Sequence, residues 1–252
     1  MKATVSAAIL AIGDELLSGR TKDKNIGFLA ENLTLAGIDL KEVRIVPDEE
    51  PEIVAAVNAL RARYTYVFTS GGIGPTHDDI TADAISAAFG VECRHDDAAM
   101  ELLGAMYARR GMEFTEARQR MARMPVGARH IPNPVSTAPG FVIGNVHVMA
   151  GVPQVFQAMV AAVLPTLSGG VPVQSRSVRS HFGEGDIGTP LGEIQKRHPE
   201  TSIGSYPKFD GQNFSTEIVV RARTPEAIDA AITDVEAMLA DIAARKVAPK
   251  PD

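Results

Sequence analysis

The stretch that most constrains the fold is residues 66–81, where a strand pattern breaks into glycines and then becomes a helix pattern. It opens with Tyr-Val-Phe-Thr-Ser, the β-branched and aromatic residues that are typical of a buried strand. The run Gly-Gly-Ile-Gly-Pro follows at residues 71–75, and the interior of a strand does not tolerate such a run. Beyond it, apolar residues recur every 3 to 4 positions, roughly the period of a helix face. The stretch therefore predicts a strand, a glycine loop and a helix in succession.

This loop has the composition of a phosphate-binding turn. Glycines leave backbone N–H groups uncovered, and the N-terminus of the following helix adds partial positive charge. Asp78 and Asp79 stand close by, and two carboxylates would repel a phosphate unless a cation lay between them. We therefore expect Gly71, Gly72 and Gly74 to hold a phosphate together with a divalent metal. The alternative is a structural turn in which one of the two acids caps the helix and the glycines only supply positive φ.

The size and charge of the chain narrow the class of protein. Its 252 residues are enough for one large α/β domain, or for a large and a small one. With 45% hydrophobic and 22% charged residues, the composition is that of an ordinary globular protein. The formal net charge of −6, with no basic run, argues against nucleic acid as the main partner. A phosphate would then be held by backbone dipoles and metal rather than by a field of lysines.

Cysteine usage and hydrophobic runs bear on the compartment. The single cysteine, Cys93, excludes an intramolecular disulfide and a zinc site built from cysteines. It fits a reducing compartment, and we expect a cytoplasmic protein. The apolar run at residues 5–12 is short and ends without a small-residue cleavage site, so a buried strand is favoured over a signal peptide. Nothing approaches about 18 consecutive apolar residues, so we expect neither a transmembrane helix nor a membrane partner.

Strand and helix patterns alternate along the first part of the chain. They predict strands at residues 7–12, 40–46 and 64–70 and helices at residues 25–36, 52–63, 96–110 and 115–124, besides the one that starts near residue 80. This alternation implies right-handed βαβ crossovers and a mostly parallel sheet. Gly-Asn at residues 144–145 predicts a hairpin, and Pro153 predicts the start of a helix that runs to about residue 164.

Acidic residues follow each of the first three predicted strands. Asp14 and Glu15 come after the first, Asp48 after the second, and Asp78 and Asp79 after the third. Because the carboxyl ends of parallel strands lie at one edge of a sheet, we expect these side chains to converge there. Each also has a simpler interpretation, namely a solvated turn charge for the first pair and a cap or turn role for Asp48.

Other polar and glycine positions could contact a ligand. Asn25 begins the first helix, and Gly151 precedes the helix at Pro153, where a second glycine turn offers a second anion site. Among the histidines, only His77 is retained as a candidate, since it lies two residues from Asp79. We expect most members of an arginine group to form a solvated face and at most one to contact a ligand: Arg109, Arg110, Arg118, Arg120 and Arg123.

The composition changes at residues 168–172, where Ser-Gly-Gly-Val-Pro indicates a linker. We therefore divide the chain into a domain at residues 1–170, a small α+β domain at residues 171–246 and a flexible tail at residues 247–252. The small domain is predicted to contain strands at residues 173–182, 201–206 and 214–221 and helices at residues 188–197 and 225–244.

Several motifs together resemble a known family. The run Gly-Gly-Ile-Gly-Pro-Thr-His-Asp-Asp-Ile-Thr at residues 71–81 resembles the signature of the MoaB/Mog (molybdopterin-binding) domain. Residues 133–141 and 151–153 resemble motifs of its CinA branch, and residues 202–207 resemble CinA and FAD-synthase sequence. The resemblance covers about residues 7–245. It implies an α/β fold with a three-layer α/β/α arrangement and a mostly parallel sheet, followed by a smaller α+β domain.

The resemblance also implies ligands and site residues. Members bind molybdopterin or adenine-dinucleotide ligands, and they form dimers and trimers, so we expect a homo-oligomer. CinA-type domains are associated with hydrolysis of ADP-ribose, and the N-terminal domain of eukaryotic FAD synthases with hydrolysis of FAD, with divalent metal and help from potassium. By motif position, Asp48 and Asp79 match the functional carboxylates of the pterin-binding branch. Gly71, Gly72 and Gly74 match its phosphate loop.

We expect a metal-dependent pyrophosphatase that hydrolyses an ADP-ribose- or FAD-like dinucleotide. Its cofactors would be Mg²⁺, Mn²⁺ or Co²⁺, together with K⁺. The expected metal ligands are Asp14, Asp78 and Asp79, and the expected catalytic residues are Asp79, Asp48 and Glu15. The expected phosphate and ligand contacts are Gly71, Gly72, Gly74, Pro75, Thr76, Asn25 and Gly151. The alternative is a non-hydrolytic module that binds molybdopterin in molybdenum cofactor biosynthesis.

Two loop positions depart from the family pattern. Ala150 stands where the family usually has proline, and Ser136 where it often has glycine, and both substitutions relax loop rigidity. They leave open a third interpretation, a regulatory or structural domain with a vestigial site. Because the sequence ends at residue 252, we expect no amidohydrolase or nucleotidylyltransferase domain. Nicotinamide-mononucleotide deamidation and FAD synthesis are therefore not carried over.

Overall fold

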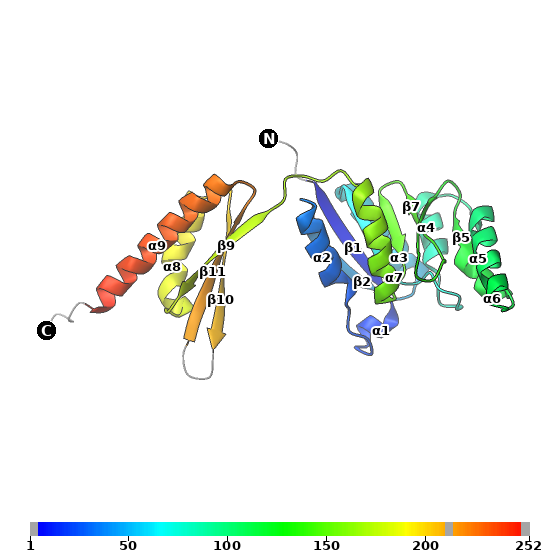
Figure 1. Cartoon of the computed structure of the whole chain (residues 1–252), viewed down its shortest axis with the longest axis horizontal. Helices are drawn as coiled ribbons and strands as arrows, with labels where there is room; N and C mark the ends of the chain where they lie inside the picture. Colours follow the sequence, from blue (N-terminus) through cyan, green and yellow to red (C-terminus); the bar gives the residue numbers. More distant parts are fainter. Residues whose placement is uncertain (1–4, 210–213, 248–252) are drawn as a thin grey trace. The chain divides into compact units, whose positions relative to one another are not determined.

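The computed structural model describes residues 5–209 and 214–247. They form two compact units, and the boundary between the units lies between Gly170 and Val171. Figure 1 shows both units and labels many of their elements. Of the tail expected at residues 247–252, only Val247 is described, as the last residue of a helix, and residues 248–252 lie outside the described residues.

The first unit is built on a six-stranded sheet in the order β2-β1-β3-β8-β7-β6. The strands are β1 (Ser6–Ile12), β2 (Asp39–Val46), β3 (Tyr66–Ser70), β6 (Arg129–Ile131), β7 (Gly140–Ile143) and β8 (Val146–Met149). The four strands from β2 to β8 run parallel, whereas β7 and β6 add two antiparallel pairings at one edge. The apolar β1 is buried from Ala7 to Ile12, as a central strand covered on both faces must be.

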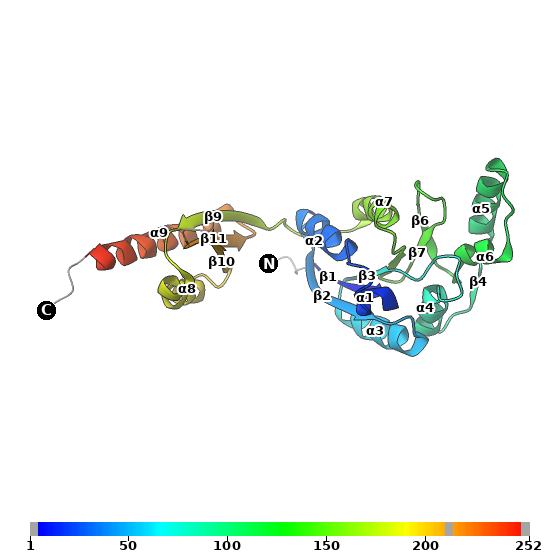
Figure 2. The same ribbon diagram turned by 90° about the horizontal axis from the view of Figure 1, so that it is seen from below.

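Helices cover both faces of this sheet, which makes the unit a three-layer α/β/α structure. They are α1 (Asp14–Leu17), α2 (Asn25–Leu35), α3 (Glu50–Arg63), α4 (Thr81–Phe89), α5 (Asp97–Arg109), α6 (Glu116–Gln119) and α7 (Pro153–Val163). Figure 2 shows α2 and α7 on one face and α3 and α4 on the other. Leu29 and Phe156 pack with Phe68 on the first face, and Ile53 and Ile85 belong to the core of the second. The predicted fold class is confirmed.

The segment between α4 and β6 contains more strand than the sequence predicts. There, β4 (Cys93–His95) and β5 (Arg123–Pro125) pair in a two-stranded antiparallel sheet. The predicted helix at residues 115–124 is wrong in extent, since α6 ends at Gln119 and a 3₁₀ turn, Arg120–Ala122, follows. Strands of three residues are too short for an alternating pattern to be recognised.

Two helices begin earlier than predicted. The helix α3 starts at Glu50 rather than near residue 52, with Pro51 in its first turn, where a missing N–H costs nothing. In the second unit, α8 (Glu184–Arg197) starts four residues before the predicted residue 188 and contains Pro190. The first turn of a helix accepts proline, which explains the start of α3. In α8, Pro190 lies inside the helix, and Gly185 and Gly188 lower the helix propensity of its first residues.

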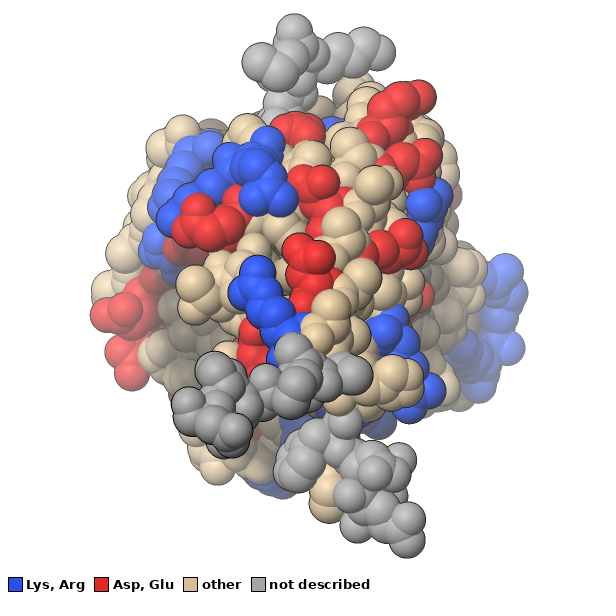
Figure 3. All heavy atoms as spheres, turned by 90° about the vertical axis from the view of Figure 1, so that its left-hand side faces the viewer, with Lys and Arg blue, Asp and Glu red and all other residues tan. Residues whose placement is uncertain are grey.

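The second unit is a three-stranded antiparallel sheet with two helices. Its elements are β9 (Gln174–Ser180), β10 (Ser202–Phe209), β11 (Phe214–Ala222), α8 and α9 (Pro225–Val247), and the strand order is β10-β11-β9. Ile218 and Val220 of β11 share a core with Ile187 of α8 and Val235 of α9. This arrangement is the α+β module that the sequence predicts. Figure 3 shows that one face of this unit carries both acidic and basic side chains.

Within residues 5–209 and 214–247, none of the helices combines the length and the apolar character needed to cross a membrane.

Candidate functional site

The carboxyl ends of β1, β2 and β3 bring acidic side chains together. The backbone N–H of Asp14 donates to the carboxylate of Asp48 at 3.0 Å, which joins the turn after β1 to the turn after β2. Partial burial raises the pKa of Asp48 above its ordinary value, and the bond from Asp14 opposes that shift. The negative charges of Asp14, Glu15 and Asp78 raise the pKa of Asp48 further. Asp48 therefore lies within electrostatic range of three other expected acids at this edge of the sheet.

Asp79 lies differently from these four, with its carboxylate turned into its own loop. It accepts hydrogen bonds from the backbone N–H of Thr76 at 2.8 Å and from the hydroxyl of Thr76 at 2.5 Å. A Cβ atom placed on Gly74 would lie 2.6 Å from the Asp79 carboxylate, so the loop closes tightly around this group. In the structure, Asp79 thus fixes the shape of residues 74–79.

Asp78 is exposed at the tip of the same loop. Hydrogen bonding from the Thr76 side chain lowers the pKa of Asp78, and the positive charges of His77 and Arg120 act in the same direction. Asp78 therefore stays ionised in acid more readily than a free aspartate. Among the described residues, no three acids, histidines or cysteines lie close enough together to hold a metal ion.

The glycine loop requires glycine at two consecutive positions. Gly71 and Gly72 have φ of +115° and +67°, a conformation that side chains disfavour. A Cβ at Gly71 would strike the carbonyl oxygen of Ile12, and one at Gly72 would strike the hydroxyl of Thr81. Thr81, the first residue of α4, donates from its hydroxyl to the Gly71 carbonyl and from its backbone N–H to the Gly72 carbonyl, both at 3.0 Å.

The helix after the loop is not capped by either acid. The residue that precedes α4 is Ile80, and no side chain caps the helix. The structural alternative, in which Asp78 or Asp79 caps the helix, is therefore wrong. The first N–H group of α4 is instead satisfied by the carbonyl of Gly72 in the loop.

Asn25 ties together three segments that meet at this edge. Its side chain is 3% exposed, and its Nδ2 donates to the Ser70 hydroxyl and to the Gly151 carbonyl, both at 2.8 Å. Its Oδ1 has no partner within the part of the chain that the structure describes. A Cβ on Gly151 would lie 3.2 Å from Cα of Gly71, so the two glycine turns pack against each other. Asn25 and Gly151 thus lie beside the glycine loop, and Asn25 is bonded to its surroundings.

The remaining sequence candidates are at the surface. Pro75, Thr76 and His77 are exposed along the loop. In the loop at residues 133–139, the Ser136 hydroxyl accepts a hydrogen bond from Asn133 Nδ2 at 2.6 Å. The serine that stands where the family often has glycine therefore takes part in the hydrogen bonding of this turn. Thr137, next to it, adopts φ of +71°.

Two arginines also reach the glycine loop. Arg120 donates from Nε to the Thr76 carbonyl at 3.2 Å and from Nη2 to the Asp79 carbonyl at 3.3 Å. Arg123 makes a forked pair with Asp83 of α4, with bonds of 2.9 and 2.5 Å. The sequence analysis named both within a group of five arginines and expected at most one to contact a ligand. It could not choose between them, because their position depends on the short pairing of β4 with β5.

Two family models match the chain. Residues 8–169 match the model described as "Probable molybdopterin binding domain", and residues 172–247 match the model "FAD synthase, middle domain". A protein of Pyrobaculum calidifontis is 34% identical over 248 residues, which cover 90% of this chain and 93% of that protein. A CinA-like protein of Citrifermentans bemidjiense is 40% identical over 167 residues, which cover 64% of this chain and 40% of that protein.

A solved structure agrees with these matches. The protein CinA of Thermoplasma acidophilum, described as having unknown function, is 31% identical with a TM-score of 0.60 and covers 65% of this chain and 99% of its own. The resemblance drawn from the motifs is thereby confirmed. Because the first family model spans more than half of the sequence, the chain belongs to the molybdopterin-binding-domain family, in a CinA-like form joined to an FAD synthase middle domain.

Proposed function

We propose that this chain is a metal-dependent pyrophosphatase that hydrolyses a dinucleotide of the ADP-ribose or FAD type. The observation that carries the proposal is the position of Asp48. This half-buried acid lies among the charges of Asp14, Glu15 and Asp78, next to a glycine loop whose backbone can bind phosphate. Carboxylates beside a phosphate site are the arrangement that a cation-assisted phosphate reaction needs.

The acids at this edge suit a hard divalent cation. Mg²⁺ is usually bound by one or two carboxylates together with waters and the phosphates of the substrate, rather than by a cage of protein ligands alone. Asp14 and Asp78, which both lie near Asp48, supply such a carboxylate pair, and we propose Mg²⁺, Mn²⁺ or Co²⁺ there, with K⁺ as an auxiliary cation. When bound, the divalent cation neutralises phosphate charge and lowers the pKa of water.

Residues of the chain would then have separate roles in the reaction. Backbone N–H groups of Gly72 and Gly74 donate to one phosphate and orient the pyrophosphate. The expected contact from Gly71 is dropped, because its N–H already donates to the Met149 carbonyl at 3.1 Å. Asp48, whose pKa is raised by burial, accepts a proton from the attacking water more readily than an exposed aspartate would. Glu15 orients that water. Asp79 holds the loop in shape through Thr76 and so positions the phosphate donors.

The test is release of AMP from ADP-ribose, FAD and NAD, each with Mg²⁺, Mn²⁺ or Co²⁺ and with or without K⁺. Loss of a general base costs a hundredfold or more, roughly, so Asp48→Asn should lower the rate by at least that factor. Asp79→Ala should also lower it, through the loop. Glu31→Gln, a change at an exposed acid of α2, serves as the control. Full activity in both aspartate variants, or no turnover in the whole panel, would refute the proposal.

A second candidate is a non-hydrolytic module that binds molybdopterin. The match of residues 8–169 to a molybdopterin-binding domain favours it. Calorimetry with molybdopterin would show micromolar binding without turnover of any dinucleotide in that case. We further propose that the protein is a homo-oligomer, a dimer or a trimer, which light scattering on the purified protein would check.

A further inference from the structure

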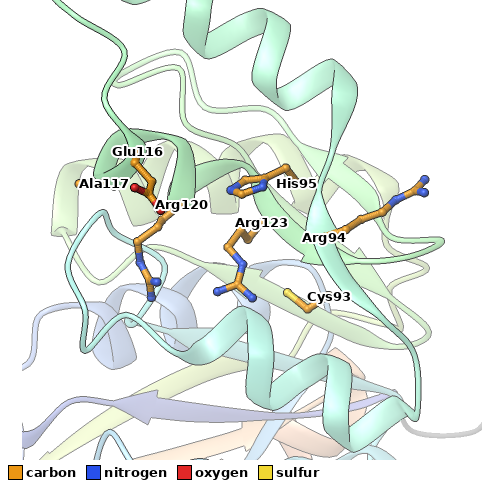
Figure 4. Close-up of a pocket in the computed structure, with 7 residues that line it drawn as sticks. All are labelled: Cys93, Arg94, His95, Glu116, Ala117, Arg120 and Arg123. Carbon is orange, nitrogen blue, oxygen red and sulfur yellow. The ribbon is translucent and has the colours of Figure 1, made fainter.

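A basic cavity is lined by residues of β4, α6, the following 3₁₀ turn and β5, and the chemistry above does not use it. Its volume is about 620 Å³, within the range of roughly 300–1,000 Å³ that is usual for ligand pockets. Figure 4 shows the residues that line it: Cys93, Arg94, His95, Glu116, Ala117, Arg120 and Arg123. The lining therefore has three arginines against one glutamate, in a chain whose net charge is −6. A concave surface with this excess of positive charge attracts anions.

The cavity shares two of its lining residues with a smaller hollow beside the glycine loop. Arg120 and Arg123 also line a smaller hollow whose wall includes Gly72 and Gly74. In Figure 4, the guanidinium groups of Arg120 and Arg123 point in the same direction, whereas Arg94 extends away from them. The two arginines therefore border both the cavity and the hollow beside the glycine loop.

Arg120 and Arg123 differ in the hydrogen bonds that they make within the protein. The bonds from Arg120 to the carbonyls of Thr76 and Asp79 use two of the five N–H donors of a guanidinium, and carbonyls do not neutralise its charge. Arg123 is held in place by its forked pair with Asp83. Arg120 thus keeps both free donors and its positive charge. Arg123 is held in a fixed orientation, and most of its charge is balanced by the Asp83 carboxylate.

We propose that this cavity is a phosphate-binding subsite, which takes a second phosphate group of the ligand whose first phosphate lies on the glycine loop. Planar guanidinium groups match the geometry of phosphate oxygens, and arginine is the residue that most often recognises them. The link to a ligand on the loop rests on the proposed function, whereas binding of phosphate in the cavity does not.

The only cysteine of the chain gives a direct readout of the cavity, because Cys93 is part of its lining. The labelling rate of the full chain with a small thiol reagent would be measured against inorganic phosphate and pyrophosphate, without metal. Burial raises the pKa of the Cys93 thiol, so the measurement belongs at alkaline pH. Saturating pyrophosphate should slow labelling about tenfold or more, because the anion covers the thiol.

Ala117 permits a change of charge that removes no contact. It is exposed in α6 and lines the cavity, so Ala117→Glu places a carboxylate in the path of the anion. We expect the Kd of pyrophosphate to rise about tenfold, and Ala117→Lys to lower it. Ala108→Glu makes the same substitution at an exposed alanine of α5 outside the lining and should leave the Kd unchanged. Arg120→Gln should weaken binding like Ala117→Glu, and calorimetry with pyrophosphate gives each Kd independently of the thiol.

Equal pyrophosphate affinity in Ala117→Glu and Ala108→Glu, or labelling of the wild type that pyrophosphate does not slow, would overturn the subsite. Its failure is distinct from failure of the proposed function, because the assay involves neither metal nor turnover. If the protein binds pyrophosphate in the cavity but hydrolyses no dinucleotide, the subsite is supported and the proposed pyrophosphatase activity is refuted. If Ala117→Glu hydrolyses a dinucleotide as well as the wild type does, the proposed function is supported and the role of the cavity as a subsite is refuted.

Discussion

At the scale of single residues, Asp48 is under two opposing influences. It accepts the N–H of Asp14 at 3.0 Å, which favours its charged form, yet burial and three neighbouring acids disfavour that form more strongly. The net result is a raised pKa, so the folded protein holds a proton at Asp48 more tightly than the unfolded chain does. A residue in this state costs stability at neutral pH and is useful as a proton acceptor.

Asp48→Asn should therefore stabilise the protein at neutral pH. Because the folded pKa lies above the ordinary value of 3.8, the contribution of Asp48 to stability is fully present below that value and is lost as pH rises through the folded pKa. Asparagine does not titrate, so the variant should exceed the wild type in neutral solution and equal it in strong acid. Urea midpoints at a series of pH values measure this, with Glu31→Gln as the control. A stability difference between Asp48→Asn and the wild type that does not change with pH would contradict a raised pKa of Asp48.

At the scale of elements, the loop between β3 and α4 is held by backbone contacts on both sides. Gly71 packs on the end of β1 and against the turn at Gly151, and Gly72 packs on Thr81. Arg120, from the 3₁₀ turn after α6, donates to the far end of the same loop. Three parts of the chain that are distant in sequence therefore fix one loop, as a preformed phosphate site requires.

Gly72→Ala tests this packing against a matched glycine. Gly90, at the end of α4, has φ of +66°, almost equal to the +67° of Gly72, but nothing lies within 4 Å of a Cβ placed there. Gly90→Ala should cost ~1 kcal/mol of unfolding free energy, for the left-handed conformation alone. Gly72→Ala should cost a further 1–3 kcal/mol, approximately, because its Cβ strikes Thr81. Urea unfolding of both variants measures the two changes in unfolding free energy. Equal losses of stability would mean that the loop shifts to make room for the Cβ atom of residue 72.

At the scale of the whole molecule, the chain has separate hydrophobic cores. The two clusters of the first unit lie on opposite faces of its sheet. The cluster of the second unit draws only on residues after 177, among them Ile218 at the centre of β11. Each unit thus buries apolar residues of its own, which is the property that lets a domain fold alone.

A fragment of residues 171–252 should accordingly unfold cooperatively in urea. Ile218→Ala should cost the fragment roughly 2–5 kcal/mol, since this side chain is fully buried against the helices. Val219→Ala, at the neighbouring position on the opposite face of the sheet, should cost much less. A fragment that shows no cooperative transition, or equal losses in the two variants, would contradict the view that this unit has its own core.

Much of the fold was predictable because its signals are local. The run of apolar residues in β1, the glycines after β3 and the period of α9 each identify an element without reference to the rest of the chain. The short strands β4 and β5 carry no such signal, since three residues pair only when a partner is supplied by the fold. The start of α3 was misplaced because a proline near a helix start is ambiguous. The start of α8 was misplaced because the glycines at residues 185 and 188 weaken its helix pattern.

For the candidate site, too, some features were predictable from local sequence and others were not. By itself the sequence determined the fold class, the glycine loop and the rule that acids after parallel strands share an edge, because these follow from residue type and strand direction. The convergence of Asp48 with other acids follows from this rule, whereas the orientation of Asp79 into its own loop is visible only in the folded protein. The tertiary structure alone brought Arg120 and Arg123 beside the glycines. The physical reason is that a pKa, a hydrogen bond and a cavity depend on distances between segments far apart in the chain, which local patterns do not contain.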